Sequence, residues 1–472
     1  MYYHQMTLLY KLKICTLCFF RRKSRIFIMF TVLQIHTLFP CKALMDGNIL
    51  QDKLDTLLKQ REFPKTICPS EAPRSLSSAE LKSLGVTEWR ELMPKVRSIL
   101  WKMREQGQVE ILQKAFKMAV TWEYSEADFV HITDWEGRTL SKFDKALQEC
   151  WCSKQNDNVF RYKLNVQKSK FLGKHRLFVQ LNTERGSLYR QPQKFVSVDE
   201  PFNPNAFNFT KMNEAEKMFE LKRKDLKGCE ATLAVNVSPI QSGHSLILPS
   251  LYSCLPQVMT EESLQVSVDV LLLSASPALR VIYNSPCAFA SINHLHFHAL
   301  YLDQRMTLET APTRHLSGPC FELVDFPSKG FMFEMGKGSS QALCRNVFKL
   351  VSFFQKNNIA HNLCLTRGTS QVSSVVTNGA RDCVRAYIWG RTACNSTVDS
   401  KTIFEILPAA CELFGFITAK TEEVYEKVSA EDVEKILHDV TNDVHQSVRN
   451  GVKLLFDGTR DSSLASSSSS FK

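Results

Sequence analysis

Three histidines alternate with apolar residues in the stretch SINHLHFHALYL, residues 291–302. Successive side chains of a β-strand point to opposite faces, so a strand here would project His294, His296 and His298 from one face and pack the intervening apolar residues on the other. Near neutral pH, such a row of imidazoles either ligates a transition metal or handles charge and protons around a phosphoryl or acyl group. The stretch therefore predicts a reactive site on an apolar strand.

A zinc site is the first alternative. A hydrolytic zinc site usually needs a carboxylate or a supported fourth ligand besides adjacent histidines, and the first acidic residue after the cluster is Asp303. A single histidine is more often an ordinary core or surface group. Three unpaired imidazoles in so apolar a strand, however, would cost stability with no packing gain. We expect no metal and rank a zinc enzyme as a distant third function.

Nucleotidyl transfer through a covalent histidine fits the stretch better. Neutral imidazole is a nucleophile near pH 7, and a phosphoramidate intermediate divides one difficult displacement into two easier ones. Such a site needs a hydrogen bond that holds the second ring nitrogen of the nucleophile, donors for the phosphate oxygens and a proton source for the leaving group. His296, the central ring, is the predicted nucleophile. We expect no cofactor, because the imidazoles can supply the positive charge.

Bulk composition indicates a soluble globular protein. The chain has 472 residues, 44% of them hydrophobic and 23% charged, a length that favours two structural units. The net charge of +11 is spread along the chain, which predicts mild attraction for small anions and no nucleic-acid partner. An odd number of scattered cysteines, 15, predicts reduced thiols and a cytoplasmic location.

The amino terminus argues against that location. A basic run at residues 21–25 precedes an apolar run at 26–33, the order of a secretory signal. Gln34 and His36 interrupt the apolar run, which is too short to span a bilayer, so we expect no stable membrane contact. We favour an over-extended start, with translation beginning at Met29 or Met45.

Residue patterns predict five segments. Short β-rich runs at 178–182, 233–237, 245–248 and 281–283 accompany a helical pattern at 261–275, and a helix at 340–354 precedes strands at 361–366 and 383–389. Ser429, followed by Asp432, predicts the start of a last helix. The segments are 1–44 (signal-like or over-extended start), 45–149 (helical region), 150–310 (catalytic domain), 311–455 (C-terminal α+β domain) and 456–472 (disordered Ser-rich tail).

The segment His294–His298 resembles the histidine-triad motif of nucleotide hydrolases and transferases, in which the middle histidine attacks the α-phosphorus. VNVSP at 235–239 and GHSLILP at 243–249 are similar to the upstream strand pair of that superfamily. There, an acidic or amide side chain holds the ribose, and the histidine after glycine lies near the phosphates. The resemblance assigns these roles to Asn236 and His244. The strand and helix patterns themselves predict an α+β fold. Together with the resemblance, we expect a histidine-triad-like antiparallel sheet with packed helices, followed by a second, degenerate α+β unit whose helix and strand order matches the first without its histidines.

A closer resemblance covers roughly residues 150–450. In order and spacing, five segments look like the GDP-D-glucose phosphorylase family of animals, whose nearest relatives are the plant GDP-L-galactose phosphorylases. They are LNTERG (181–186), FNFTK (207–211), NS (284–285), SINH (291–294) and HNLCLTRG (361–368). The family tends to have a glycine pair where this chain has Pro286 and Cys287, and glycine at Ala299. A side chain there could obstruct a phosphate, so altered activity is an expectation.

This resemblance implies cleavage of GDP-glucose by inorganic phosphate to GDP and glucose 1-phosphate, through a guanylylated His296. His298 and His244 would hold the phosphate oxygens and leaving group, and His294 would position the nucleophile. The weaker assignments are phosphate contacts or loop support by Asn284, Ser285 and Asn293, and a base slot lined by Phe207, Phe209 and Lys211, the two phenylalanines being equally consistent with core.

Two other functions remain open: a nucleotide-sugar hydrolase of the same fold, and a non-catalytic guanine-nucleotide-binding relative. The expected partners are a GDP-sugar and phosphate, and a homodimer is the assembly we allow for.

Overall fold

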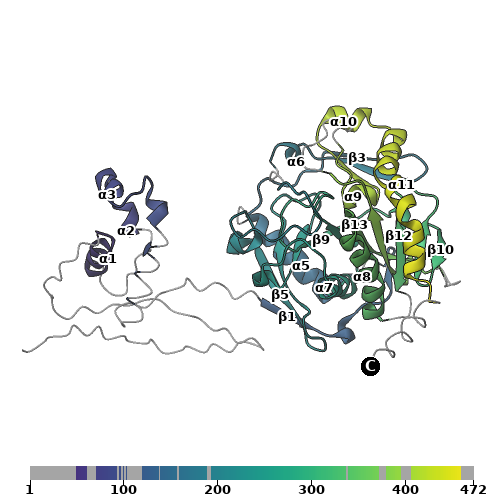
Figure 1. Cartoon of the computed structure of the whole chain (residues 1–472), viewed down its shortest axis with the longest axis horizontal. Helices are drawn as coiled ribbons and strands as arrows, with labels where there is room; N and C mark the ends of the chain where they lie inside the picture. Colours follow the sequence, from purple (N-terminus) through teal and green to yellow (C-terminus); the bar gives the residue numbers. More distant parts are fainter. Residues whose placement is uncertain are drawn as a thin grey trace, which may run out of the picture. The chain divides into compact units, whose positions relative to one another are not determined.

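The computed structural model describes residues 49–60, 71–92, 95–96, 99, 103, 120–137, 139–156, 159–188, 193–335, 339–371, 379–394 and 406–458. It divides into two compact units, residues 1–118 and 119–472 (Figure 1). The signal-like segment predicted at 1–44 and nearly all of the Ser-rich tail lie outside the described residues. Among the helices that are described, none is long and apolar enough to cross a membrane.

The N-terminal unit contains short helices around a small apolar cluster of its own, which includes Leu50, Leu54 and Ala72. Ser77 starts one of these helices by a capping box, because its side chain accepts the Glu80 N–H while the Glu80 carboxylate accepts the Ser77 N–H. The described elements are α1 (Ile49–Gln60), α2 (Glu71–Arg74), α3 (Ser78–Ser83) and η1 (Trp89–Leu92).

An eleven-stranded sheet forms the framework of the second unit. All neighbouring strands are antiparallel except the parallel pair β1 and β5. In spatial order the strands are β1 (Val120–Tyr124), β5 (Lys217–Arg223), β6 (Glu230–Val235), β7 (Ser245–Pro249), β9 (Phe297–Tyr301), β8 (Leu279–Asn284), β13 (His361–Gly368), β15 (Cys383–Gly390), β12 (Phe331–Met335), β11 (Cys320–Leu323) and β10 (Thr313–Ser317).

The sheet contains the same arrangement twice. In the first half, two strands (β6, β7), helix α7 (Glu261–Leu273) and two more strands (β8, β9) follow one another, and β11, β12, α8 (Ser340–Lys356), β13 and β15 repeat that order. The halves meet where β8 pairs with β13, and α7 and α8 lie side by side (Figure 1). The α+β class is thus confirmed. The side chains of Arg385, Tyr387 and Trp389 on β15 point to the same face of the sheet as the side chain of His298 on β9.

Two layers cover the sheet. On one face, α7, α8 and α5 (Lys142–Asn156) enclose the larger core, which includes Phe297 and Ala299. On the other face, a second core includes Ile282 and Leu300 and is closed by a small sheet in which β4 pairs in parallel with β16 and antiparallel with β3. The elements of this layer are β3 (Lys168–Leu172), β4 (Leu177–Leu181), β16 (Phe416–Ala419), α9 (Ala410–Leu413) and α10 (Glu422–Lys427).

The remaining described elements are short connections and one long helix, α11 (Ala430–Leu455), which begins at Ser429 with the predicted capping box. The others are β2 (Thr133–Asp134), β14 (Ala380–Arg381), α6 (Thr183–Leu188), η2 (Glu126–Asp128), η3 (Phe209–Lys211), η4 (Glu214–Glu216), η5 (Leu251–Ser253) and η6 (Thr307–Glu309).

Candidate active site

The prediction that the three histidines share one strand is wrong. Strand β9 begins at Phe297, so only His298 lies in the sheet, and His294 and His296 precede it. The reason is a competing set of hydrogen bonds: the Leu295 N–H donates to the Leu255 carbonyl and the His296 N–H to the side chain of Gln257, not to a neighbouring strand. The alternation of faces nevertheless holds, because the intervening apolar residues lie in the core.

His296 has the environment of a neutral nucleophile. Its ring is buried, and its Nδ1 lies 2.7 Å from the carbonyl oxygen of His294, to which it donates. The remaining lone pair is therefore on Nε2. Burial lowers the pKa of His296 to about 4, so the ring is uncharged at neutral pH. A neutral imidazole with an oriented second nitrogen is the form that attacks phosphorus.

Gln257 fixes the backbone of that nucleophile. Its Oε1 accepts the His296 N–H at 2.8 Å and its Nε2 donates to the His296 carbonyl at 3.0 Å. The same Nε2 donates to the Asn284 carbonyl, and the Gln257 side chain is fully buried. The sequence gives no signal for this role, since the residue is a single glutamine in a loop.

His244 and His298 form a second, directly bonded pair, with Nε2 of His244 3.0 Å from Nδ1 of His298. The Ile240 N–H donates to Nδ1 of His244, so the neutral ring carries its proton on Nε2 and donates it to His298. His298 consequently carries its own proton on Nε2. Burial lowers the pKa of His244 to about 3 and the pKa of His298 well below its usual value.

Asn236 lies beside this pair. Its Nδ2 is 3.1 Å from Nε2 of His244 and 3.4 Å from Nδ1 of His298, and its Oδ1 accepts the Ser238 N–H. The rings of His296 and His298 are 5.1 Å apart between centroids. The structure thus brings His244, His296, His298 and Asn236 together, although they come from three strand ends.

His294 uses both ring nitrogens for structure. Its Nδ1 accepts the Phe209 N–H at 3.0 Å and its Nε2 donates to the Leu251 carbonyl at 3.1 Å. Burial lowers its pKa to about 4. The ring therefore ties two loops to the segment that carries the nucleophile, and neither nitrogen is available to substrate.

For Asn284, Ser285 and Asn293 we expected phosphate contacts or loop support, and the hydrogen bonds they make are to loops. Asn293 accepts the Gln257 N–H and donates to the Glu200 and Pro201 carbonyls. Oδ1 of Asn284 accepts from Asn362 and from the Ala410 N–H, and Oγ of Ser285 accepts the His361 N–H. These three residues hold the loops around the histidines.

The three residues predicted to line the base slot differ in where their side chains lie. Phe209 is buried, with its ring 5.0 Å from that of His296, and Phe207 packs edge-on against Phe209 at 6.1 Å. Lys211 directs its Nζ to the carbonyls of residues 204–206. Phe209 therefore belongs to the wall behind the nucleophile, whereas Lys211 stabilises the neighbouring loop.

The two departures from the family pattern differ in consequence. Ala299 is fully buried in the core on the face opposite His298, so its methyl group lies away from the histidines. Cys287 and Phe289 adopt positive φ angles of 59° and 69°, the region where glycine is favoured. The loop after Ser285 therefore keeps a glycine-like backbone without the glycine.

Arg185 lies near the histidine pair, and sequence reasoning did not single it out. Its Nη1 donates to the Ser238 carbonyl at 2.7 Å, next to Asn236. Burial is the larger cause of the lowered pKa of His244, and the positive charge of Arg185 lowers that pKa further. The same charge contributes to the lowered pKa of His298. Burial raises the pKa of Glu412 to about 7, which Arg185 opposes. The only sequence signal was its place in the LNTERG segment.

No group of three or more His, Cys, Asp or Glu side chains in the described ranges is arranged to hold a metal ion. In the histidine cluster itself, both nitrogens of His244 and His294 and Nδ1 of His296 and His298 are engaged in hydrogen bonds.

Acid should destabilise this protein through its buried histidines. Their pKa values lie below the value of about 6.5 for the unfolded chain, so as pH falls the unfolded state binds protons first. The stabilisation is present above pH 6.5 and is lost as pH falls toward 4, by about 1.4 kcal/mol per pH unit for each histidine. Urea unfolding between pH 7 and 5 measures this slope. The number of protons taken up on unfolding sets this slope, and in His294→Gln that number should be smaller by about one. An unchanged slope would contradict the assignment.

Gly243→Ala should destabilise the turn before His244. Gly243 has φ of +70°, and a Cβ there would lie 2.7 Å from the Tyr301 ring. We expect a loss of about 2–3 kcal/mol, from about 1–2 kcal/mol of left-handed strain plus the clash, in urea unfolding. Gly228→Ala is the matched control, because its φ is +80° and its nearest neighbour, Glu262, is 3.7 Å away. Equal losses in both variants would show that Tyr301 contributes nothing.

Comparisons with known proteins give consistent matches. The family model "GDPGP1-like, N-terminal domain" matches residues 142–300, and "GDPGP1-like, C-terminal domain" matches 303–448. A third model, a protein of unknown function (DUF3253), matches 48–123. The chain is 37% identical over 320 residues to GDP-D-glucose phosphorylase 1 of Danio rerio, covering 66% of this chain and 92% of that protein.

Two further relatives extend the comparison. GDP-D-glucose phosphorylase 1 of Homo sapiens is 35% identical over 303 residues, covering 61% of this chain and 77% of the relative. GDP-L-galactose phosphorylase 1 of Arabidopsis thaliana is 30% identical over 308 residues, covering 61% of this chain and 67% of the relative.

Proposed function

The chain belongs to the GDPGP1-like family of GDP-D-glucose phosphorylases, and from this membership we infer that it cleaves GDP-glucose with inorganic phosphate to GDP and glucose 1-phosphate. It is an enzyme of the nucleotidyltransferase type. The identities of the base, guanine, and of the sugar, glucose, are inferred from the relatives. The observation that carries the chemistry is the neutral, oriented ring of His296, whose Nδ1 donates to the His294 carbonyl and whose Nε2 keeps its lone pair.

In the first step that we propose, Nε2 of His296 attacks the α-phosphorus of GDP-glucose. A nitrogen–phosphorus bond forms, the bond from the α-phosphorus to the bridging oxygen breaks, and glucose 1-phosphate leaves with that oxygen. The His296 ring, now bonded to phosphorus at Nε2 and still protonated at Nδ1, becomes positively charged. The hydrogen bond from Nδ1 to the His294 carbonyl supports that charge, because a hydrogen bond to a charged donor is stronger than one to a neutral donor.

In the second step, an oxygen of inorganic phosphate attacks the same phosphorus. The nitrogen–phosphorus bond breaks, its electrons return to Nε2, and GDP is released. His296 is neutral again, with its proton still on Nδ1. The two displacements therefore balance without a metal ion or an external redox partner.

We propose that His298 and His244 act together on the phosphate oxygens. The fixed tautomers leave a proton on Nε2 of His298, with His244 donating to its Nδ1 from behind. A donor in this position can hydrogen-bond a phosphate oxygen as negative charge develops. We assign Asn236, which adjoins both rings, to the ribose or to the same oxygens.

Charge balance gives Arg185 its proposed role. The diphosphate of a GDP-sugar carries about two negative charges, whereas the four buried histidines are neutral. Of the cations in the described ranges, Arg185 is the one whose charge lowers the pKa of both His244 and His298. We propose that its guanidinium binds the diphosphate, as planar guanidinium groups often do.

Product analysis tests the assigned reaction. GDP-glucose incubated with the protein and phosphate should give GDP and glucose 1-phosphate in equal amounts, with no GMP. Release of GMP at the same rate without phosphate would identify a hydrolase, and binding without products would identify a non-catalytic relative.

The cytoplasmic location, the homodimer and the absence of nucleic-acid and membrane partners remain part of the proposal. Cell fractionation, light scattering and binding assays with DNA, RNA and lipid vesicles test them.

A further inference from the structure

A pocket of about 300 Å³ lies on the face of the sheet away from the histidines. Tyr301, on β9, forms part of its wall and points to the same face as Ala299, whereas His298 points to the other. Ser242 forms another part of the wall, just before Gly243 and His244. The proposed reaction uses none of the pocket's side chains, so the pocket needs its own explanation.

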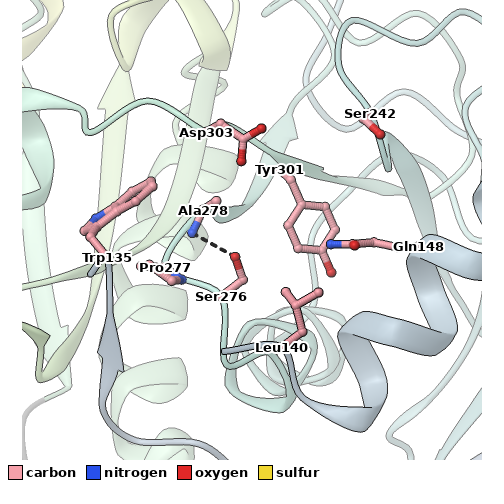
Figure 2. A pocket seen from close by; sticks show the side chains of 9 residues that line it. All are labelled: Trp135, Leu140, Gln148, Ser242, Ser276, Pro277, Ala278, Tyr301 and Asp303. Atoms are coloured by element: carbon pink, nitrogen blue, oxygen red, sulfur yellow. Dashed lines mark hydrogen bonds between the residues drawn. The ribbon is translucent and has the colours of Figure 1, made fainter. Parts of the chain in front are cut away.

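The walls of the pocket are aromatic and apolar. Figure 2 shows the rings of Trp135 and Tyr301 on opposite sides, with Leu140 below them. Both rings turn their polar atoms to buried carboxylates: Nε1 of Trp135 donates to Glu309 at 2.9 Å and the Tyr301 hydroxyl donates to Asp144 at 2.8 Å. Both side chains are otherwise buried, with 4% of Trp135 and 6% of Tyr301 exposed, so only their edges line the pocket, whereas Leu140 is 37% exposed.

The polar rim has unused hydrogen-bonding capacity. Within the part of the chain that the structure describes, the carboxylate of Asp303 and the hydroxyl of Ser242 have no hydrogen bond or ion pair. Both residues are exposed, and Asp303 lies between the two rings in the view of Figure 2. The Gln148 side chain projects from α5 toward Tyr301 on the same wall. Gln148 is itself hydrogen-bonded to Tyr301, so a ligand with several hydroxyl groups would use Asp303 and Ser242.

Charge around the pocket disfavours an anion. Glu309 pairs with the buried Arg280 and Arg381, and Arg305 pairs with Glu136. Asp303 is then the uncompensated charge of the described lining, and it would repel a phosphate. Nucleotides and sugar phosphates are therefore poor candidates.

A cation is also disfavoured. The face of Trp135 attracts cations, but the guanidinium groups of Arg280 and Arg305 each lie 5.9 Å from the centre of that ring. A further cation at the ring would be repelled by two existing ones. What remains is a neutral molecule with an apolar face for the rings and adjacent hydroxyl groups for a carboxylate.

We propose that this pocket is a binding site for a neutral monosaccharide. The C–H groups of the sugar contact Leu140 and the exposed edges of Trp135 and Tyr301, and neighbouring hydroxyls donate to Asp303, with Ser242 on the rim. The volume suits one sugar ring, since it stands at the lower end of the range for small-molecule sites, about 300–1,000 Å³. This inference does not depend on the proposed function of the histidines.

Calorimetric titration of the whole protein with D-glucose and D-mannose tests the proposal, in the presence and absence of GDP. We expect saturable binding of at least one hexose, unchanged by GDP, with affinity reduced about tenfold or more in Asp303→Asn. Glu149→Gln is the matched control, because Glu149 is an exposed carboxylate on the same helix as Gln148 but outside the lining. It should bind as the unmodified protein does.

Several results would overturn the proposal. They are no saturable binding of either hexose, equal binding by Asp303→Asn, hexose binding that GDP abolishes, or tighter binding of glucose 6-phosphate or of tetramethylammonium. Because hexose binding is measured without turnover, a failure of the phosphorylase assignment would not produce any of these results.

The pocket shares the Ser242–Gly243 turn with the active site, so a bound sugar should also change turnover. We expect a saturating hexose to alter kcat in the unmodified enzyme and to have no effect in Asp303→Asn. An unchanged kcat despite measured binding would refute this coupling and leave the binding site standing.

Discussion

Replacing His296 with alanine should eliminate the guanylyl adduct and lower kcat by about 10⁴-fold or more. His296 is the ring whose Nδ1 is held by a carbonyl and whose backbone is fixed on both sides by Gln257. Removing it leaves the diphosphate without a nucleophile. Intact-protein mass spectrometry after brief incubation with GDP-glucose, without phosphate, measures the adduct directly. The unmodified enzyme should gain the mass of a guanylyl group and lose it when phosphate is added.

Two comparisons make the His296 result interpretable. His438→Ala replaces a half-exposed histidine on α11 and should keep the adduct and the rate. Thermal unfolding of His296→Ala checks that the loss is chemical, because truncating a buried ring also costs stability. An adduct that persists in His296→Ala, or that maps to His298 by peptide analysis, would refute the nucleophile assignment.

Much of the fold could be predicted from local pattern. The helices at α7 and α8 and the strands β7, β8, β13 and β15 follow from apolar periodicity, and α11 from its capping residues. Pairings between distant segments have no local signal. Strand β4, predicted at residues 178–182, lies outside the main sheet because it pairs with β16, more than two hundred residues later.

The same limit applies to the site. His296 is visible in sequence because its chemistry lies in the residue type and its spacing. The strand predicted around it was wrong because the Gln257 side chain and the Leu255 carbonyl take the backbone hydrogen bonds that a strand partner would have used. The role of Gln257 depends on a loop that returns to the nucleophile from about forty residues upstream. Periodicity does not encode such a contact.

Asn293 shows what residue type leaves open. An amide beside three histidines predicts either a contact with phosphate or support of the loop, and its contacts are those of loop support: its Oδ1 accepts the Gln257 N–H and its Nδ2 donates to two carbonyls. Its hydrogen-bonding groups are thus used by the fold. Arg185 is the converse case, because its sequence neighbours are unremarkable for catalysis and only the folded chain brings its charge to His244 and His298.

Arg185→Met should lower kcat/KM by about 10²–10³-fold, since removing one preformed donor to a developing charge typically costs about 3–4 kcal/mol. Methionine keeps the length of the side chain and removes the charge. Arg185→Lys should recover part of the rate, because a lysine restores the charge but not the planar pair of donors. Steady-state kinetics with GDP-glucose measures both, and Arg345→Met, on the exposed face of α8, is the matched control.

A structural role for Arg185 makes a different prediction. Its Nη1 donates to the Ser238 carbonyl, so its loss could simply loosen the loop that holds Asn236. In that case lysine would rescue poorly, and the pKa values of His244 and His298 would be unaffected. If the charge acts on the site, NMR titration of Arg185→Met should find these two pKa values higher than in the unmodified enzyme, because a nearby cation lowers them. A rate within threefold of the unmodified enzyme, with both pKa values unchanged, would remove Arg185 from the reaction and leave the diphosphate to neutral donors alone.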